Sequence, residues 1–295
     1  MFFGSIPALV TPFSGGRVAE DTFREFVEWQ IDQGSNALVP CGTTGEAATL
    51  STDEHRSAVE IAVEVARGRV PVIAGCGSNS TAHAIELTKI ARDCGADAAL
   101  HVPPYYNRPN QDGIYLHLSA VADLDIPVIL YNVPARTITD IAIDTMAKLS
   151  RLPNVVGVKD ATANLARTSQ QRLAMGAEFN LLSGEDATAL GFMAHGGHGC
   201  ISVVSNIAPR LCADFQNACL AGDYKTALVL QDRLMPLHDA MFCEANPGPV
   251  KYAASRLGLC EAGMRLPLVP ISQASQRIVD AALARVGLVQ ARAAE

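Results

Sequence analysis

The amino-acid sequence predicts a (β/α)8 TIM barrel with a C-terminal helical appendage. Short apolar runs alternate with longer amphipathic segments, and this alternation repeats eight times at a spacing of about 25 residues. The length of 295 residues suits one barrel of roughly 250 residues with a small addition. Strands joined by helical crossovers form parallel sheets, so a closed barrel is expected, with a doubly wound open sheet as the alternative.

The expected strands are the short apolar runs, and a helix follows each of them. We expect strands at residues 6–10, 37–39, 70–74, 98–102, 127–131, 155–159, 179–182 and 200–204. We expect helices at residues 21–33, 51–66, 80–94, 113–122, 143–150, 165–175, 187–195 and 209–221. Local signals support these boundaries, among them a capping box of Ser51 with Glu54 and a terminating glycine, Gly95.

Three more helical segments follow the eighth unit without strands between them. They are expected at residues 224–242, 249–258 and 271–286. The sequence therefore predicts a catalytic barrel over residues 1–223 and a three-helix extension over residues 224–295.

The composition is that of a globular protein, with 49% hydrophobic and 18% charged residues. The formal net charge of −7 argues against nucleic acid or an anionic membrane as a partner. None of the eight cysteines forms a CxxC pair, so we expect buried thiols. Since the N-terminus lacks a basic region and no apolar run reaches about 18 residues, the sequence predicts a soluble, cytoplasmic protein.

Lys159 is the main candidate for chemistry. Catalytic groups of this fold lie where strands end, and Lys159 ends the apolar run at 155–158. Apolar surroundings would favour its neutral amine, which is the form that attacks a carbonyl carbon. The alternative is a lysine whose stem lies along the strand end while its ammonium reaches solvent.

Other polar residues just past the expected strands could assist such a lysine. Gly42-Thr43-Thr44-Gly45 offers N–H groups and hydroxyls that suit a small carboxylate, or it is only a tight turn. Tyr131 and Tyr106 could pass protons, although packing is the commoner role of tyrosine. Arg136 could hold a second carboxylate or lie at the surface. These positions lack the carboxylate or histidine cluster of a metal site, and His195 with His198 alone is weak evidence for one.

Together these segments resemble the pyruvate-aldolase superfamily that includes dihydrodipicolinate synthase and N-acetylneuraminate lyase. The resemblance runs from residue 4 to residue 258, nearly the whole chain. The matching segments, all in the expected order, are Gly42-Thr43-Thr44-Gly45-Glu46, Pro104-Tyr105-Tyr106-Asn107-Arg108-Pro109, Tyr131-Asn132-Val133-Pro134 with Arg136-Thr137, Gly157-Val158-Lys159-Asp160-Ala161-Thr162, and Gly196-Gly197-His198-Gly199. The Tyr-Tyr-Asn segment and Arg136 favour the dihydrodipicolinate synthase branch over the sugar-acid lyases.

The resemblance implies a lyase of lysine biosynthesis that needs no cofactor. Its substrates would be pyruvate and L-aspartate-4-semialdehyde, its product 4-hydroxy-tetrahydrodipicolinate, and its assembly a homotetramer built as a dimer of dimers. Lys159 would form an imine with pyruvate, while Tyr131, Thr43 and a neighbouring subunit's Tyr106 relay protons. The substrate-binding residues implied are Thr44 (with Thr43) for the pyruvate carboxylate, Arg136 for the semialdehyde carboxylate, and the backbone of Gly184 and Ile201.

The resemblance also implies a lysine-binding regulatory site at a subunit interface. The matching positions are Ala48, Thr52, His55, Asn79, His83 and Tyr105. His83 stands where lysine-sensitive relatives commonly carry a glutamate, so we expect weak or absent inhibition by lysine. Two other functions stay open at this point: a sister aldolase acting on a keto-deoxy sugar acid, and a barrel that binds without catalysis.

Overall fold

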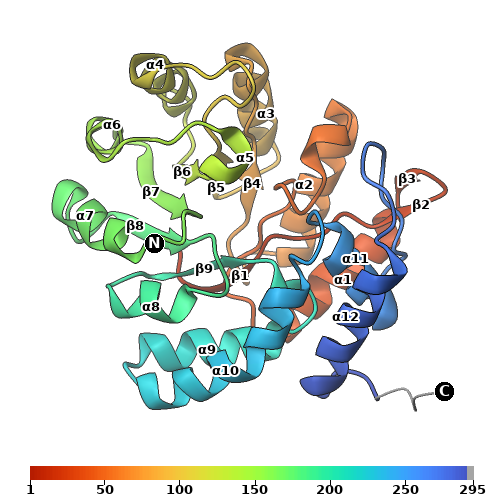
Figure 1. Cartoon of the computed structure of the whole chain (residues 1–295). Coiled ribbons are helices and arrows are strands. Elements are labelled where there is room, and N and C mark those ends of the chain that lie inside the picture. The colour runs from red at the N-terminus through yellow and green to blue at the C-terminus, as the bar shows by residue number, and fades with distance from the viewer. Residues whose placement is uncertain (291–295) are drawn as a thin grey trace.

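Seven parallel strands curl into one sheet, and helices cover its outer side (Figure 1). The structure is a computed structural model that describes residues 1–290. The order of the strands in the sheet is β1-β9-β8-β7-β6-β5-β4. Their bounds are Gly4–Pro7 (β1), Ile73–Gly75 (β4), Ala98–His101 (β5), Val128–Asn132 (β6), Val155–Asp160 (β7), Asn180–Ser183 (β8) and Gly199–Ser202 (β9).

The expected second strand closes the barrel, although its pairing is irregular. Residues 37–39 lie between β1 and β4 and form only isolated parallel bridges, from Val39 to Ala8 and from Leu38 to Val72. Backbone hydrogen bonds run from this segment to both neighbours. Because it joins the two edges of the seven-stranded sheet, the predicted (β/α)8 barrel is confirmed.

The helices that follow the barrel strands lie close to their expected positions. They are α1 (Glu20–Asp32), α2 (Thr52–Ala66), α3 (Thr81–Asp93), α4 (Gln111–Ala122), α6 (Ile143–Leu149), α7 (Leu165–Met175), α8 (Ala189–Ala194) and α9 (Pro209–Leu220). The capping box is confirmed, since Ser51 Oγ accepts from the Glu54 N–H at 3.2 Å and Glu54 Oε2 accepts from the Ser51 N–H at 2.9 Å. The expected ends of several helices differ from the observed ends, because the capping residues stand outside the helix itself.

Several short elements were missed, and some strand limits were wrong. The missed elements are the antiparallel pair β2 (Phe13–Ser14) and β3 (Arg17–Val18), helix α5 (Pro134–Thr137), and the 3-10 helices η1 (Ala47–Thr49) and η2 (Val204–Asn206). Two expected strands, at 6–10 and 200–204, continue too far. Ala8 forms only the isolated bridge to Val39, and residues 9–10 and 203–204 are buried but belong to no strand, so their apolar character reflects burial more than strand pairing.

The three expected C-terminal helices are present. They are α10 (Tyr224–Ala240), α11 (Gly248–Arg256) and α12 (Gln273–Arg285). Helix α10 packs against α9 and α12, and α11 packs against α12 and η2. The division into units at residue 223 stays a prediction, and residues 291–295 of the expected extension lie outside the described part.

Strand alternation separates the barrel interior from the layer between sheet and helices. Tyr131 and Ile201 belong to an interior cluster, whereas Leu130 and Val158 pack in a cluster with residues of α4 and α6. Within residues 1–290, no helix is both long and apolar enough to cross a membrane.

Candidate active site

Lys159 and Tyr131 lie side by side at the ends of two neighbouring strands. They are register partners on β7 and β6, and Lys159 Nζ lies 4.1 Å from the centroid of the Tyr131 ring. Both side chains are buried, at 6% and 7% exposure. Lys159 is therefore held against the phenol ring inside the barrel, which rules out the alternative of a lysine that reaches solvent.

Gly184 leaves room for the lysine side chain. A Cβ atom built at Gly184 would lie 2.9 Å from Lys159 Cε and 2.8 Å from Ala161 Cβ. The Gly184 N–H also donates to the Asp160 carbonyl at 2.7 Å, so the backbone of this loop passes directly beside β7. Ile201 lies on β9 in the interior cluster, with 1% of its surface exposed.

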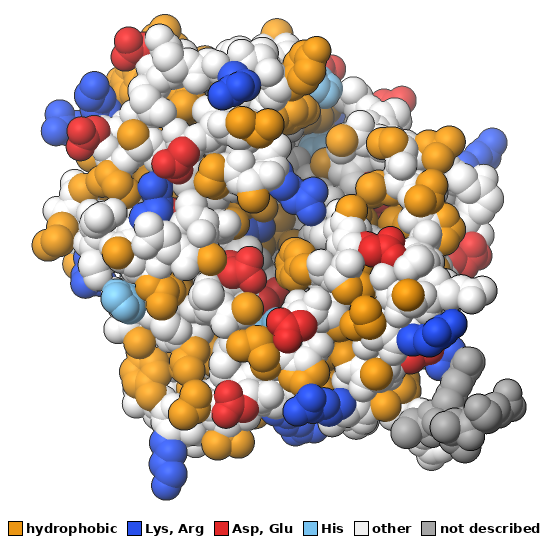
Figure 2. Space-filling view, in the orientation of Figure 1, with side chains coloured by type: hydrophobic (Ala, Val, Ile, Leu, Met, Phe, Trp, Pro, Cys, Tyr) orange, Lys and Arg blue, Asp and Glu red, His pale blue; other side chains and the backbone are white. Residues whose placement is uncertain are grey.

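A cavity of about 660 Å³ opens beside this pair. Figure 2 shows a hollow near the centre of the face in view. Of the predicted site residues, those that line the cavity are Thr43, Tyr131, Arg136, Ala48, Thr52, His55, Asn79, His83 and Tyr105. Three of the expected catalytic and substrate residues thus share one continuous space with the expected lysine-site residues in the single chain. Lys159, Thr44, Tyr106, Gly184 and Ile201 are not among its lining residues.

Asn246 links two predicted carboxylate-binding residues and was missed by the sequence analysis. Its Nδ2 donates to Thr44 Oγ1 at 3.0 Å, and its carbonyl accepts from Arg136 Nη2 at 3.4 Å. Asn246 lines the cavity, and its Oδ1 is buried without a protein partner within residues 1–290. The only local signal was the Asn-Pro-Gly-Pro run at 246–249.

A buried ion pair stabilises the loop that carries Thr43 and Thr44. Lys251 Nζ of α11 lies 2.7 Å from Glu46 Oε1 and donates to the Thr11 carbonyl at 2.9 Å. Thr11 Oγ1 in turn donates to the Gly45 carbonyl at 2.7 Å. Glu46 has a φ of 55°, a left-handed conformation that costs energy and needs such support. Burial lowers the pKa of Lys251, and its pairing with Glu46 opposes that shift.

Tyr106 faces solvent in the single chain. Its side chain is 89% exposed, and its backbone has a φ of 70°. Its expected role in a neighbouring subunit's site stays a prediction.

Two titratable groups near Lys159 have shifted pKa values. Burial raises the pKa of Glu185, and the nearby Lys159 opposes this shift. Burial also raises the pKa of Cys200, which makes this thiol a poor nucleophile at neutral pH. All eight cysteines are free, and five of them are buried.

The two histidines considered for a metal have other partners. His198 Nδ1 accepts from the Leu181 N–H at 3.0 Å, and His195 Nδ1 lies 3.2 Å from Ser169 Oγ. Residues 1–290 contain no group of three or more His, Cys, Asp or Glu side chains placed to hold a metal ion.

A hydroxyl-lined cavity beside a buried lysine on a barrel strand is the arrangement that the sequence resemblance implied. The model of the Dihydrodipicolinate synthetase family matches residues 1–286. The chain belongs to this family.

Relatives within the family match the chain along its whole length. The 4-hydroxy-tetrahydrodipicolinate synthase of Parvibaculum lavamentivorans is 62% identical over 98% of this chain and 100% of its own length. The synthase of Methylobacterium radiotolerans is 60% identical over 97% of this chain and 96% of its own. These comparisons confirm the lyase class that the sequence predicted.

Solved structures agree at the level of the fold. A chloride-inhibited dihydrodipicolinate synthase from Acinetobacter baumannii, complexed with pyruvate, superposes with a TM-score of 0.95 at 44% identity, covering 98% of this chain and 100% of that one. A dihydrodipicolinate synthase from Cyanidioschyzon merolae with lysine bound superposes with a TM-score of 0.94 at 37% identity, covering 98% and 99%.

Proposed function

We propose that this chain condenses pyruvate with L-aspartate-4-semialdehyde through an imine on Lys159, giving 4-hydroxy-tetrahydrodipicolinate. The observation that carries the proposal is the buried Lys159 amine, held 4.1 Å from the Tyr131 ring beside a cavity of about 660 Å³. Curated relatives at 60% identity and above bear the name of this synthase.

The reaction begins when the Lys159 amine attacks the pyruvate carbonyl carbon. The carbinolamine loses water to give the imine, and deprotonation of the pyruvate methyl group gives an enamine. The enamine carbon then adds to the aldehyde. The amine of the second substrate attacks the imine carbon, which closes the ring and releases Lys159. Protons pass through Tyr131, Thr43 and the Tyr106 of a neighbouring subunit.

Two carboxylates have to be bound by a chain of net charge −7. Thr43 and Thr44 hold the pyruvate carboxylate through hydroxyl and backbone N–H groups, next to the backbone of Gly184 and Ile201. Arg136 lines the cavity and receives the carboxylate of the semialdehyde. The local positive charge of this arginine offsets the repulsion of the overall field.

We also propose the location, assembly, unit boundaries and regulation of this enzyme. The enzyme acts in the cytoplasm as a homotetramer built as a dimer of dimers, without a cofactor. Its barrel covers residues 1–223, and residues 224–295 form the extension. A lysine-binding regulatory site includes Ala48, Thr52, His55, Asn79, His83 and Tyr105.

The test uses Lys159→Arg. An arginine keeps the positive charge but stays protonated, so it forms no imine. In the unmodified protein, pyruvate with borohydride should add one pyruvate-derived group, which peptide mapping locates on Lys159. In Lys159→Arg the adduct should be absent, and the rate should fall roughly 10²-fold or more. Lys148→Arg, at an exposed position on α6, is the matched control and should keep the adduct and the reaction rate of the unmodified protein. An adduct that persists in Lys159→Arg would contradict the proposal.

A further inference from the structure

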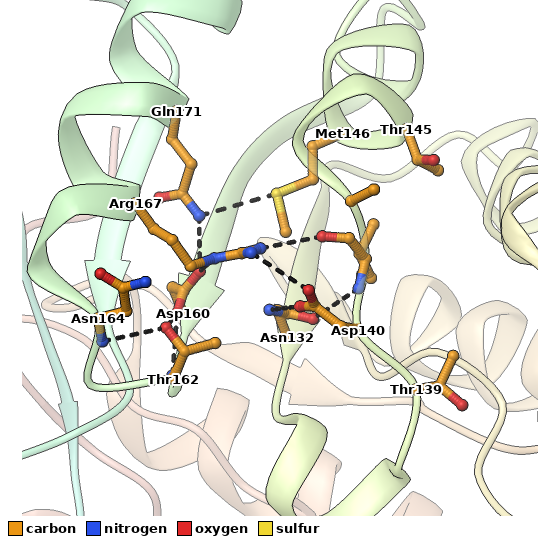
Figure 3. A network of polar contacts seen from close by, with 12 residues as sticks. Asn132, Thr139, Asp140, Thr145, Met146, Asp160, Thr162, Asn164, Arg167 and Gln171 are labelled. Carbon is orange, nitrogen blue, oxygen red and sulfur yellow. Dashed lines mark hydrogen bonds and ion pairs between the residues drawn. The ribbon is translucent and has the colours of Figure 1, made fainter.

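The residue after Lys159 begins a polar network on the outer side of the barrel (Figure 3). Successive strand residues face opposite sides, so Asp160 points away from the interior and toward α7. Its carboxylate is 4% exposed. Asp160 Oδ2 accepts from Arg167 Nε at 3.0 Å and from Gln171 Nε2 at 2.6 Å, and Oδ1 accepts from the Thr162 N–H at 2.9 Å.

The residue after Tyr131 takes part in the same network from the neighbouring strand. Asn132 Nδ2 donates to Asp140 Oδ1 at 2.8 Å, and Asn132 Oδ1 accepts from the Ile141 N–H at 2.9 Å. Figure 3 shows the Arg167 guanidinium extending between these groups and Asp160. Its Nη1 donates to Asp140 Oδ2 at 3.3 Å and its Nη2 to the Ile141 carbonyl at 2.9 Å. One arginine of α7 therefore connects the ends of β6 and β7.

The register of the two strands places this network directly behind the proposed reacting pair. Tyr131 is paired with Lys159, and Asn132 with Asp160. We infer that Arg167, with Asp140 and Asp160, is a positioning residue that fixes the separation of Lys159 and Tyr131 and so sets the rate of imine formation. This inference rests on the proposed function, because it concerns the same imine.

A positioning role follows from how the pair is held. Lysine has a flexible stem, and inside the barrel its amine contacts the Tyr131 ring at 4.1 Å, so its place depends on where the two strand ends lie. A buried carboxylate needs its full set of partners, and Arg167 supplies the compensating charge for Asp160. Without Arg167, Asp160 keeps its bonds from Gln171 and Thr162 but loses its charged donor and its link to Asp140, so the end of β7 can shift relative to β6. A displacement of about 1 Å in a reacting group can cost roughly 10²-fold in rate.

The experiment measures the single-turnover rate of imine formation, by quenching with borohydride after mixing with saturating pyruvate. Arg167→Met removes the guanidinium bridge but keeps an unbranched apolar stem that reaches about as far as Nε. We expect the rate to fall roughly 10- to 100-fold, with a smaller change in the pyruvate concentration that half-saturates it. Arg256→Met is the matched control, since it breaks another partly buried ion pair, 3.1 Å to Asp280, between α11 and α12. It should lower the melting temperature and leave the rate unchanged.

A second variant covers the case in which Arg167→Met does not fold. Arg167→Lys keeps the charge, but its single ammonium cannot reproduce the planar fork that contacts Asp160, Asp140 and Ile141. We expect a folded protein whose rate lies between those of Arg167→Met and the unmodified chain. A rate equal to that of the unmodified protein in both variants, or in Arg167→Lys if only this one folds, would overturn the inference.

A double-mutant cycle with Tyr131→Phe separates positioning from general stability. If Arg167 acts through the arrangement of the pair, Arg167→Met should cost less in the Tyr131→Phe background, because the phenol no longer needs to be placed. Equal losses in both backgrounds would overturn the inference and mark Arg167 as structural only. If the unmodified protein forms no pyruvate adduct, the proposed function fails, and the positioning inference fails with it.

Discussion

His101 is a fully buried histidine, and its protonation in the unfolded chain should lower the stability of the fold at mildly acidic pH. It lies on β5, and its Nε2 is 3.1 Å from Thr88 Oγ1. Because the Thr88 hydroxyl already donates to the Ala84 carbonyl, Nε2 must carry the proton and donate to Thr88. A second proton would go to Nδ1, which has no partner within residues 1–290. Burial, with a smaller repulsion from His117, lowers the pKa of His101 to about 3.

The magnitude follows from proton linkage. The pKa of a histidine in the unfolded chain is about 6.5, so below that pH the unfolded state binds a proton that the folded state refuses until about pH 3. The contribution that neutral His101 makes to the unfolding free energy is present above pH 6.5 and is lost as the pH falls toward 3. Between pH 7 and pH 5 the unfolded chain takes up about 0.7 proton at this site, and the integrated effect lowers the unfolding free energy by about 2 kcal/mol.

The assay compares His101→Gln with the unmodified protein in urea unfolding at several pH values and one protein concentration. Glutamine can still donate to Thr88 but does not titrate, so the loss of unfolding free energy from pH 7 to pH 5 should be about 2 kcal/mol smaller. His195→Gln, at an exposed position, is the control and should keep the slope of the unmodified protein. Equal slopes for His101→Gln and the unmodified chain would refute the reasoning.

Two further predictions concern neighbouring subunits and regulation. Tyr106→Phe should lower the rate roughly 10²- to 10⁴-fold, the usual scale of acid–base assistance, and mixing it with inactive Lys159→Arg should restore part of the activity in hybrid dimers. No recovery after verified subunit exchange would place Tyr106 in its own chain's site. L-lysine should inhibit the unmodified protein weakly or not at all in initial-rate assays, and His83→Glu should strengthen inhibition roughly 10- to 150-fold by supplying an acceptor for the ligand ammonium. Sub-millimolar inhibition of the unmodified protein near neutral pH would contradict this.

The barrel was predictable because its strands are buried on both faces and therefore appear as uninterrupted apolar runs. The same signal could not give strand limits, since residues 9–10 are as buried as β1 itself but belong to no strand. The β2–β3 pair was missed although Gly15-Gly16 between two short segments is a recognised hairpin signal. Helix α5 likewise has a local signal in Pro134, which stands at its first position.

The candidate site was predictable where it depends on neighbouring residues and not where it depends on long-range contacts. Lys159 and Tyr131 end apolar runs, and the barrel geometry alone brings such ends together. Asn246 and Lys251 could not be found this way. Asn246 bonds to Thr44 across 202 positions and Lys251 to Glu46 across 205, and no periodicity connects residues so far apart.

The residues that support the site come from two different helices, α11 of the C-terminal extension and α7 of the helical layer around the barrel. Helix α11 supplies Lys251, which holds the loop of Thr43 and Thr44 through Glu46. Helix α7 supplies Arg167, which holds the strand ends of Lys159 and Tyr131. Strand side chains alternate between interior and exterior. The neighbour of each interior residue therefore points outward, where side chains of the helical layer bind it. The separation of Lys159 and Tyr131 thus depends on side chains that do not contact a substrate. Among changes remote from the cavity, those on α7 should alter the rate of imine formation most directly.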